Sequence, residues 1–201
     1  MIVIVVTGGI GSGKSEVCRI LYDMGFRAQY NADLRAKSLY ETHPTLLDEI
    51  EKSLGCRLRD DMGVFQPAML ASVIFSDKMA LECVENHLFP ALMDDFESYA
   101  GTCGEEIVVF ESATVLEKKQ FEGFGDKVIL VDAPFEVRLD RACRRDGSDT
   151  DKVLARMQNQ KLMNDLSAGC VDPRIDCRIV NDGTFEDLEC RTKKAINSLI
   201  L

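Results

Sequence analysis

Residues 1–25 read MIVIVVTGGIGSGKSEVCRILYDMG, and this stretch decides the fold. It opens on Met1–Val6, an apolar run rich in β-branched residues, which is typical of a strand buried on both faces of a parallel sheet. After a glycine-rich segment, apolar residues recur at the helical spacing i, i+3, i+4, i+7: Val17, Ile20, Leu21 and Met24. Gly25 ends this predicted helix. A strand, a glycine loop and a helix form the first unit of an α/β fold.

The loop between this strand and helix carries a phosphate-binding pattern. The pattern G-x-x-x-x-G-K-S/T is matched at every fixed position by Gly8-Gly9-Ile10-Gly11-Ser12-Gly13-Lys14-Ser15. Glycines let the backbone fold around an anion, and the helix start adds a positive dipole end. Lys14 is suited to the β- and γ-phosphates of ATP, and the Ser15 hydroxyl to Mg²⁺. A chance glycine-rich turn would not need the flanking strand and helix, so we expect a nucleotide site.

Composition excludes several other classes of protein. The 201 residues are 46% hydrophobic and 29% charged, as in ordinary soluble globular proteins. With 34 acidic and 24 basic residues the net charge is -10, which disfavours general nucleic-acid binding. No apolar run suits a signal peptide or membrane helix, so we expect a cytoplasmic protein without a membrane partner. The eight cysteines form no Cys-x-x-Cys pair, and we expect buried free thiols, not disulfides or zinc ligands.

The remaining chain alternates buried strands with helical segments. Strand-like runs occur at 107–110, 128–131 and 177–180, and a short strand is expected before Asn31. Helical periodicity marks 135–169 and about 185–199. Between Asp33 and Glu105 it is helical as well, which predicts a helical insertion packed on one side of a parallel sheet.

The loop alone does not define the reaction. A GTPase would need a distal Asn/Thr-Lys-x-Asp motif, and the sequence has none. A motor or transporter ATPase usually has a longer chain and a strand ending in Asp or Asp-Glu, whereas 107–110 is followed by Glu111-Ser112-Ala113. Small P-loop kinases commonly place Mg²⁺-linked waters and the acceptor through such residues, which favours a kinase. A kinase for another nucleotide or small hydroxyl acceptor, and a slow nucleotide-dependent switch protein, are the alternatives.

Several segments, in order along the chain, resemble the dephospho-CoA kinase family. They are Val6–Ser15, Asn31-Ala32-Asp33, Glu111-Ser112-Ala113 with Glu117, Arg138-Leu139-x-Arg141, Arg156–Gln160 and Ile179–Gly183. The family usually has Asp-Ala-Asp at the second of these segments, so Asn31 departs from it. The resemblance implies transfer of the ATP γ-phosphate to the ribose 3′-hydroxyl of dephospho-CoA, the last step of coenzyme A synthesis.

The resemblance also implies an architecture. It is a P-loop kinase fold with a five-stranded parallel sheet flanked by helices, a helical substrate lobe and a helical lid. The core would comprise about 1–33, 105–139 and 170–201. The CoA-binding lobe would span about 34–104, and the lid about 140–168.

The resemblance assigns roles to individual residues. Asp33 matches the proposed general base, although an Asp there is also suited to capping the following helix. Arg141 is the expected phosphate contact within a basic cluster that also contains Arg138, Arg144 and Arg145; the alternative is a solvated face paired with Asp140 and Asp146. The expected catalytic residues are Asp33, Lys14 and Arg141. The expected ATP-binding residues are Gly9, Ile10, Gly11, Ser12, Gly13, Lys14, Ser15, Glu16 and Asn181, with Ser15 as the Mg²⁺ ligand.

Three further positions are open to a second interpretation. Asn181 is implied to bind adenine, but Asn181-Asp182-Gly183 also reads as a plain turn. The family often carries His-Pro in the helical lobe where this chain has Phe89-Pro90, so we expect His87 to be structural or exposed. His43-Pro44 is expected to begin a helix.

Overall fold

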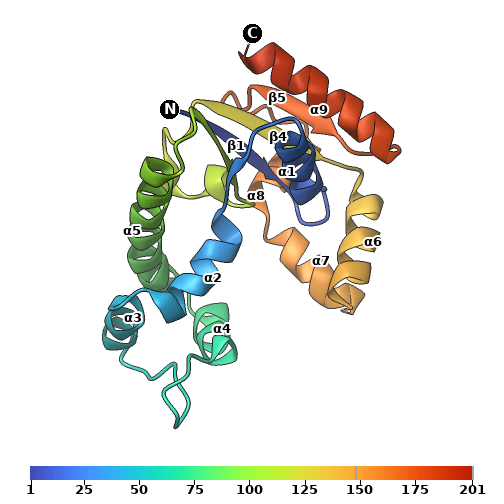
Figure 1. Cartoon of the computed structure of the whole chain (residues 1–201). Coiled ribbons are helices and arrows are strands. Elements are labelled where there is room, and N and C mark those ends of the chain that lie inside the picture. Colours follow the sequence, from blue (N-terminus) through green and yellow to red (C-terminus); the bar gives the residue numbers. More distant parts are fainter. Residues whose placement is uncertain (148, 201) are drawn as a thin grey trace. The chain divides into compact units, whose positions relative to one another are not determined.

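The structure is a computed structural model that describes residues 1–147 and 149–200. The chain forms two compact units (Figure 1). The first combines Met1–Asn31 with Cys103–Leu201 and contains the sheet, and the second is the helical segment Ala32–Thr102.

A five-stranded parallel sheet forms the centre of the first unit, as the sequence predicts. Its strands are β1 (Ile2–Gly8), β2 (Ala28–Asn31), β3 (Ile107–Glu111), β4 (Lys127–Asp132) and β5 (Cys177–Val180). The strand order is β2-β3-β1-β4-β5, so β1 lies in the middle and is buried from Val3 onward. This position explains the unbroken apolar run at the start of the chain.

The strand register brings several functional positions to one edge of the sheet. Val6 pairs with Glu111, and Asn31 pairs with the same Glu111 from the other side. On the opposite flank of β1, Gly8 pairs with Val131. The carboxyl ends of β1, β2 and β3 therefore meet, and this is the edge at which open α/β sheets bind ligands.

Helices α1 (Lys14–Asp23) and α9 (Phe185–Ile200) lie side by side over one face of the sheet (Figure 1). The sheet contributes every second residue of its strands to a common core with them: Ile4, Val6, Val109, Ile129 and Val131 from the strands, Val17, Ile20 and Leu21 from α1, and Leu188, Ala195 and Ile196 from α9. This packing fixes the start of α1 against the end of β1.

The other face of the sheet is packed by aromatic rings. Phe110 stacks on Tyr30 with ring centroids 5.4 Å apart, and meets Phe124 edge-on at 4.6 Å. Each such pair contributes about 0.5–1.5 kcal/mol beyond the burial of area. The stacked pair joins β2 to β3 one residue before Asn31 and Glu111, so it fixes the spacing of those two side chains.

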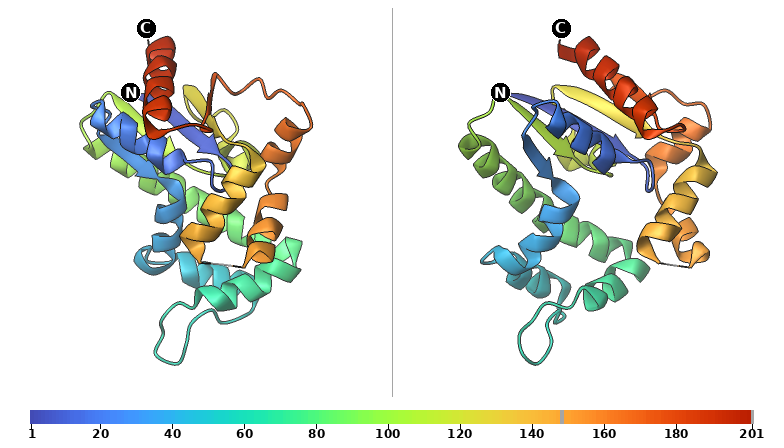
Figure 2. Two further views of the ribbon diagram at one scale, coloured as in Figure 1. Left: turned by 90° about the vertical axis from the view of Figure 1, so that its right-hand side faces the viewer. Right: turned by 45° about the vertical axis from the view of Figure 1, so that its right-hand side comes forward.

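Three helices occupy the predicted lid region: α6 (Phe135–Asp146), α7 (Thr150–Gln158) and α8 (Lys161–Ser167). Residue 148 of that region lies outside the described residues. Helices α6 and α7 run side by side (Figure 2), held by a small apolar cluster of Ala142, Val153 and Met157. Asp149 caps α7 by accepting a hydrogen bond from the Asp151 amide at 3.3 Å. The helical prediction for this region is confirmed.

The second unit contains α2 (Ala32–Thr42), α3 (Leu46–Leu54), α4 (Pro67–Ser76) and α5 (Lys78–Thr102). Arg35 on α2 forms a two-point ion pair with Asp95 on α5, with distances of 2.8 and 2.5 Å. His43 lies before α3, and its Nδ1 accepts the Leu46 amide at 3.1 Å, so the expected role at a helix start is confirmed. His87 on α5 contacts Ser53 of α3 at 3.0 Å through Nε2, which is a structural contact.

The cysteines correct one expectation. All eight are free, but only Cys18 is buried, whereas Cys170 and Cys190 are exposed and the rest are partly exposed. Cys18 alone lies on the sheet-facing side of a core helix, which accounts for its burial. Among the helices of residues 1–147 and 149–200, none is long and apolar enough to cross a membrane.

Candidate functional site

The loop from β1 to α1 turns tightly because glycines occupy two crowded positions. Gly11 has φ 75° and Gly13 has φ 98°, in the left-handed region. A Cβ on Gly11 would lie 2.1 Å from the backbone oxygen of Arg138, and one on Gly13 would lie 2.2 Å from Nδ2 of Asn181. Both positions therefore exclude a side chain by conformation and by space.

The same turn leaves backbone donors for an anion. Within the described residues, the N–H groups of Gly11, Gly13 and Ser15 donate to no acceptor. They surround the N-terminus of α1, whose dipole also favours negative charge. The Ser12 hydroxyl is buried and, in the described part of the chain, has no partner either. This set of donors fits the phosphate chain of a nucleoside triphosphate.

Lys14 lies across the loop. Its Nζ donates to the carbonyl oxygens of Gly8 at 2.9 Å and Gly9 at 3.2 Å. Charged phosphate oxygens accept stronger hydrogen bonds from an ammonium group than neutral carbonyls do. The structure thus places the Lys14 ammonium where it can exchange a carbonyl for a phosphate oxygen with a small movement of its flexible stem.

A hydrogen-bonded group at the carboxyl edge of the sheet joins Ser15 to two strands. The Ser15 hydroxyl donates to Glu111 Oε1 at 2.7 Å, and the Asn31 amide donates to Glu111 Oε2 at 2.7 Å. The Glu111 side chain is buried, and so is Cys18 beside it. Burial raises the pKa of the Cys18 thiol well above its ordinary value, and the Glu111 charge raises it further. The hydroxyl oxygen of Ser15 and the carboxylate of Glu111 are oxygen ligands of the kind that Mg²⁺ prefers.

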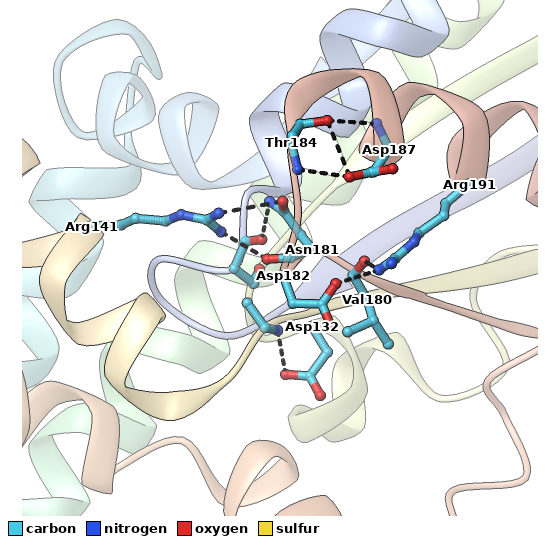
Figure 3. Close-up of polar contacts among 10 residues, drawn as sticks. Asp132, Arg141, Val180, Asn181, Asp182, Thr184, Asp187 and Arg191 are labelled. Atoms are coloured by element: carbon cyan, nitrogen blue, oxygen red, sulfur yellow. Dashed lines mark hydrogen bonds and ion pairs between the residues drawn. The ribbon is translucent and has the colours of Figure 1, made fainter.

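Asn181, directly after β5, contacts the phosphate-binding loop and also accepts hydrogen bonds from Arg141 (Figure 3). Its Nδ2 donates to the Ser12 carbonyl oxygen at 2.9 Å. Arg141 on α6 reaches the backbone oxygen of Asn181 at 3.2 Å and its Oδ1 at 3.4 Å. Thr184 and Asp187 then close the turn into α9 by reciprocal hydrogen bonds. The residue is therefore both part of a turn and a support for the phosphate-binding loop.

Arg138 is the arginine of the basic cluster that touches the loop. It is 4% exposed, its Nε donates to the Ala133 carbonyl at 3.1 Å, and Nη1 lies 2.2 Å from where a Cβ on Gly9 would sit. Burial lowers the pKa of Arg138, an effect opposed by the charge of Asp132, and the guanidinium still remains a cation. A buried cation at this point adds positive potential to the loop.

Gln160 connects the loop to the turn between α7 and α8. Its Oε1 accepts the Ile10 amide at 2.8 Å, and the residue is 7% exposed. The Ile10 side chain packs against the apolar cluster between α6 and α7. The loop is thus held from three sides, by Arg138, Asn181 and Gln160.

Comparison with known proteins shows the family. The family model described as Dephospho-CoA kinase matches residues 2–184, which is most of the chain. The chain belongs to the dephospho-CoA kinase family. A dephospho-CoA kinase of Porphyromonas gingivalis is 37% identical over 172 residues, covering 86% of this chain and 84% of the relative. Among solved structures, TT1252 from Thermus thermophilus superposes with a TM-score of 0.83 at 28% identity, covering 100% of this chain and 98% of that one.

A second solved structure, the dephospho-CoA kinase from Campylobacter jejuni, shares the fold, with a TM-score of 0.65 at 22% identity and coverage of 98% and 96%. The architecture is therefore that of a P-loop kinase, as predicted. Membership of the dephospho-CoA kinase family makes the protein a phosphotransferase that uses ATP and dephospho-CoA.

In this kinase the predicted general base lies in the helical unit. Asp33 follows β2 by two residues and occupies the first turn of α2, where it is exposed. An acidic residue in a first turn also stabilises the helix dipole. Because α2 begins at Ala32, Asp33 lies inside the first turn and not at the capping position, and its catalytic role stays a prediction.

The other arginines of the basic cluster separate into exposed pairs. Arg144 contacts Asp140 at 3.0 Å, and Arg145 contacts Asp146 at 2.7 Å. Hydrogen bonds from Arg145 and then Arg156 lower the pKa of Asp146 to about 2. Arg144 and Arg145 match the solvated-face interpretation, while Arg138 lies against the loop and Arg141 contacts Asn181.

Reasoning from sequence linked Glu111-Ser112-Ala113 to Mg²⁺-linked waters and the acceptor, but it did not predict the contact of Glu111 with Ser15 or that of Gln160 with Ile10. A signal existed for Glu111, because it is a charged residue directly after an apolar strand of a parallel sheet. Gln160 ends the segment Arg156–Gln160 that resembles the family, but that segment gave no indication of its partner. Its contact with Ile10 joins residues 150 positions apart, and only the packing of α7 and α8 creates it.

Proposed function

We propose that residues 8–15 bind the triphosphate of ATP as its Mg²⁺ complex, and that the enzyme transfers the γ-phosphate to the ribose 3′-hydroxyl of dephospho-CoA. The observation that supports this most directly is the set of amides at Gly11, Gly13 and Ser15, which have no acceptor among the described residues and lie beside Lys14. Mg²⁺ would be held by Ser15 and would neutralise charge on the β- and γ-phosphates. We expect the enzyme to act in the cytoplasm.

The remaining roles follow from the chemistry of the transfer. Asp33 accepts the proton of the 3′-hydroxyl as its oxygen bonds to the γ-phosphorus, and the bond from that phosphorus to the β–γ bridging oxygen breaks to release ADP. Lys14 and Arg141 balance the charge that develops on the phosphoryl oxygens. Residues of about 34–104 bind the CoA moiety, and about 140–168 form the lid. Asn181, which already contacts Ser12, lies beside the adenine.

The test is a coupled assay of ADP release with dephospho-CoA, AMP, CMP and shikimate as acceptors. We expect only dephospho-CoA to stimulate release, and ³¹P NMR of the product to show a 3′-phosphomonoester. Stimulation by another acceptor instead would reject the assignment, and retention of nucleotide without transfer would favour a switch protein.

Lys14→Ala gives a matched negative control for this assay. Removal of one preorganised cation at a phosphoryl group should lower kcat by about 10²–10³-fold, while the thermal unfolding midpoint stays unchanged. Lys193→Ala, which removes an exposed lysine paired with Glu189 on α9, should leave turnover unaltered.

A further inference from the structure

We propose that the outer face of helix α4 is a weak, symmetric contact between two copies of this chain, with the two α4 helices antiparallel about a twofold axis. This outer face consists of Ala68, Ala71, Ser72 and Phe75, which recur at the helical spacing i, i+3, i+4, i+7 and are all exposed. The proposal concerns assembly and goes beyond the phosphoryl transfer proposed above.

The composition of α4 is that of a covered helix. Residues 62–76 read MGVFQPAMLASVIFS, which is the longest run in the sequence without a charged residue. The next longest, Met1–Gly13, contains the buried strand β1. Among the side chains of α4 that the structure describes, by contrast, only Leu70 is buried. A helix without a charged side normally lies inside a protein or against a partner, so the exposure of α4 indicates a contact outside the single chain.

The inner side of α4 is already occupied by its own unit. Leu70, Val73 and Ile74 lie at i, i+3, i+4 and are buried or half-buried, and α4 packs against α5. On the opposite side Phe75 is 87% exposed, and Met79 at the start of α5 is 80% exposed. Two large apolar side chains therefore lie in solvent on the side that α5 does not cover.

The sizes of the side chains along the outer face favour a second copy as the occupant. If a twofold axis passes between positions 71 and 72 of an antiparallel pair, position 75 of one copy faces position 68 of the other. Each Phe75 ring then lies over an Ala68, and the small Ala71 and Ser72 at the centre let the helix axes approach to about 8 Å. The same face thus supplies both the ring and the space for it, as a self-complementary contact requires.

Charges at the two ends of α4 favour the antiparallel direction. Lys78 follows its C-terminus, and Asp61 precedes its N-terminus. Both are exposed, and in the described part of the chain neither forms an ion pair. An antiparallel pair brings each Lys78 towards the Asp61 of the other copy, whereas a parallel pair brings like charges together. The uncharged face between them also lets two chains of net charge -10 meet without opposing carboxylates.

The size of the face limits its affinity. A helix of 10 residues is about 15 Å long, so the contact is smaller than the roughly 800 Å² per partner of a standard interface. Contacts of that class are weak and transient. We therefore expect a dissociation constant between about 10 µM and about 1 mM.

Sedimentation velocity of the full-length protein, from about 1 µM to about 500 µM, tests the proposal. We expect the average mass to rise with concentration from that of one chain towards that of two. Ala71→Glu places two carboxylates beside the twofold axis and should keep the protein monomeric over this range. Its far-UV circular dichroism should be unchanged, because glutamate is a good helix former at an exposed position. An unmodified protein that is monomeric at every concentration would overturn the proposal.

An exchange of sizes tests the paired positions. Phe75→Ala removes the ring, and Ala68→Phe sets two rings against each other, so each should raise the dissociation constant at least about tenfold. The double variant that combines Ala68→Phe with Phe75→Ala again places a ring opposite an alanine, with the positions reversed. It should recover most of the association. A double variant that associates no better than either single variant would contradict the antiparallel pairing.

Two comparisons complete the design. Phe185→Ala removes a ring that is 42% exposed at the start of α9, and it should leave the dissociation constant unchanged. The Michaelis constant for dephospho-CoA is measured for Phe75→Ala at low protein concentration, where the chain is monomeric. A raised value there, with an unmodified protein that never dimerises, would assign the outer face of α4 to the acceptor and overturn the proposal.

Discussion

The side-chain oxygen of Gln160 accepts a hydrogen bond from the backbone N–H of Ile10 at 2.8 Å, which joins the phosphate-binding loop to the helices that follow α6. Gln160 is buried and Ile10 is half-buried, and the Ile10 side chain packs into the apolar cluster of α6 and α7. One loop residue is therefore held by its amide and by its side chain at once. A displacement of the lid helices near Gln160 would be transmitted to the loop through this bond.

Gln160→Leu should destabilise the protein measurably. Leucine fills a similar volume but leaves the Ile10 amide without its acceptor, which costs about 1–3 kcal/mol when the donor is buried. Urea unfolding of both proteins at pH 7 measures the difference in free energy of unfolding. The matched control is Gln158→Leu, two positions earlier and exposed, which should stay within about 0.5 kcal/mol of the unmodified protein. Equal values for the two variants would contradict the importance of the Gln160–Ile10 bond.

Two loop glycines should respond differently to the same substitution. In Gly11→Ala the new Cβ would lie 2.1 Å from the backbone oxygen of Arg138. The residue would also have to keep φ 75°, in the left-handed region. The left-handed conformation alone costs about 1–2 kcal/mol for a residue with a Cβ. In Gly9→Ala the nearest obstacle is Nη1 of the Arg138 side chain at 2.2 Å, which can move.

A second change at Arg138 tests this distinction. Combined with Gly9→Ala, Arg138→Lys removes the clashing nitrogen and should restore part of the lost free energy of unfolding. Combined with Gly11→Ala, it should restore nothing, because the backbone oxygen remains. Fluorescence-monitored unfolding gives the free energy of unfolding of the two single glycine variants and the two double variants. Equal rescue of both glycine variants would exclude the proposed clash at Gly9.

Much of the fold could be predicted because its signals are local. Each strand is a short apolar run, and the loop 8–15 is contiguous, so pattern and structure coincide there. The contacts that support the loop are different in kind. Asn181 meets Ser12 across 169 positions, and which arginine of α6 faces the loop depends on how α6 packs. The spacing i, i+3, i+7 of Arg138, Arg141 and Arg145 is that of one helical face, but only packing separates the buried Arg138 from the exposed Arg145.

The same distinction explains Asn31. In the sequence alone, Asn31 stands at the end of β2 where the family usually has an aspartate. In the structure its amide binds Glu111, a carboxylate from the neighbouring strand 80 positions away. Strand register, which no local pattern in either segment specifies, brings the two together.

The ion pairs of Asp146 should make stability depend on pH. Hydrogen bonds from Arg145 and Arg156 lower its pKa from 3.8 to about 2 in the folded state. A depressed folded pKa gives stability that is present above pH 4 and is lost as pH falls towards 2. The effect of Asp146→Asn on the unfolding midpoint should therefore be largest at pH 7 and shrink below pH 4.

This effect should be small, under about 1 kcal/mol, because both arginines are half-exposed and solvent screens the pairs. Added salt should reduce it further. Asp140→Asn breaks the more exposed pair with Arg144 and serves as the control for the loss of a surface carboxylate on the same helix. A difference for Asp146→Asn that stayed constant from pH 7 to pH 3 would show that its contacts act through packing and not through charge.

Asp33→Asn separates the two roles assigned to Asp33. Asparagine keeps the size of Asp33 but loses the charge that favours the dipole in the first turn of α2, which should cost at most about 0.3–1 kcal/mol of stability. It cannot accept a proton, and kcat for dephospho-CoA phosphorylation should fall about 10²–10⁴-fold, with the affinity for ATP little changed. The acidic limb of the pH–rate profile of the unmodified enzyme should disappear in the variant. Asp48→Asn, in the first turn of α3, provides the matched control and should retain turnover. A turnover of Asp33→Asn close to that of the unmodified enzyme would instead assign Asp33 only to stabilisation of the α2 dipole.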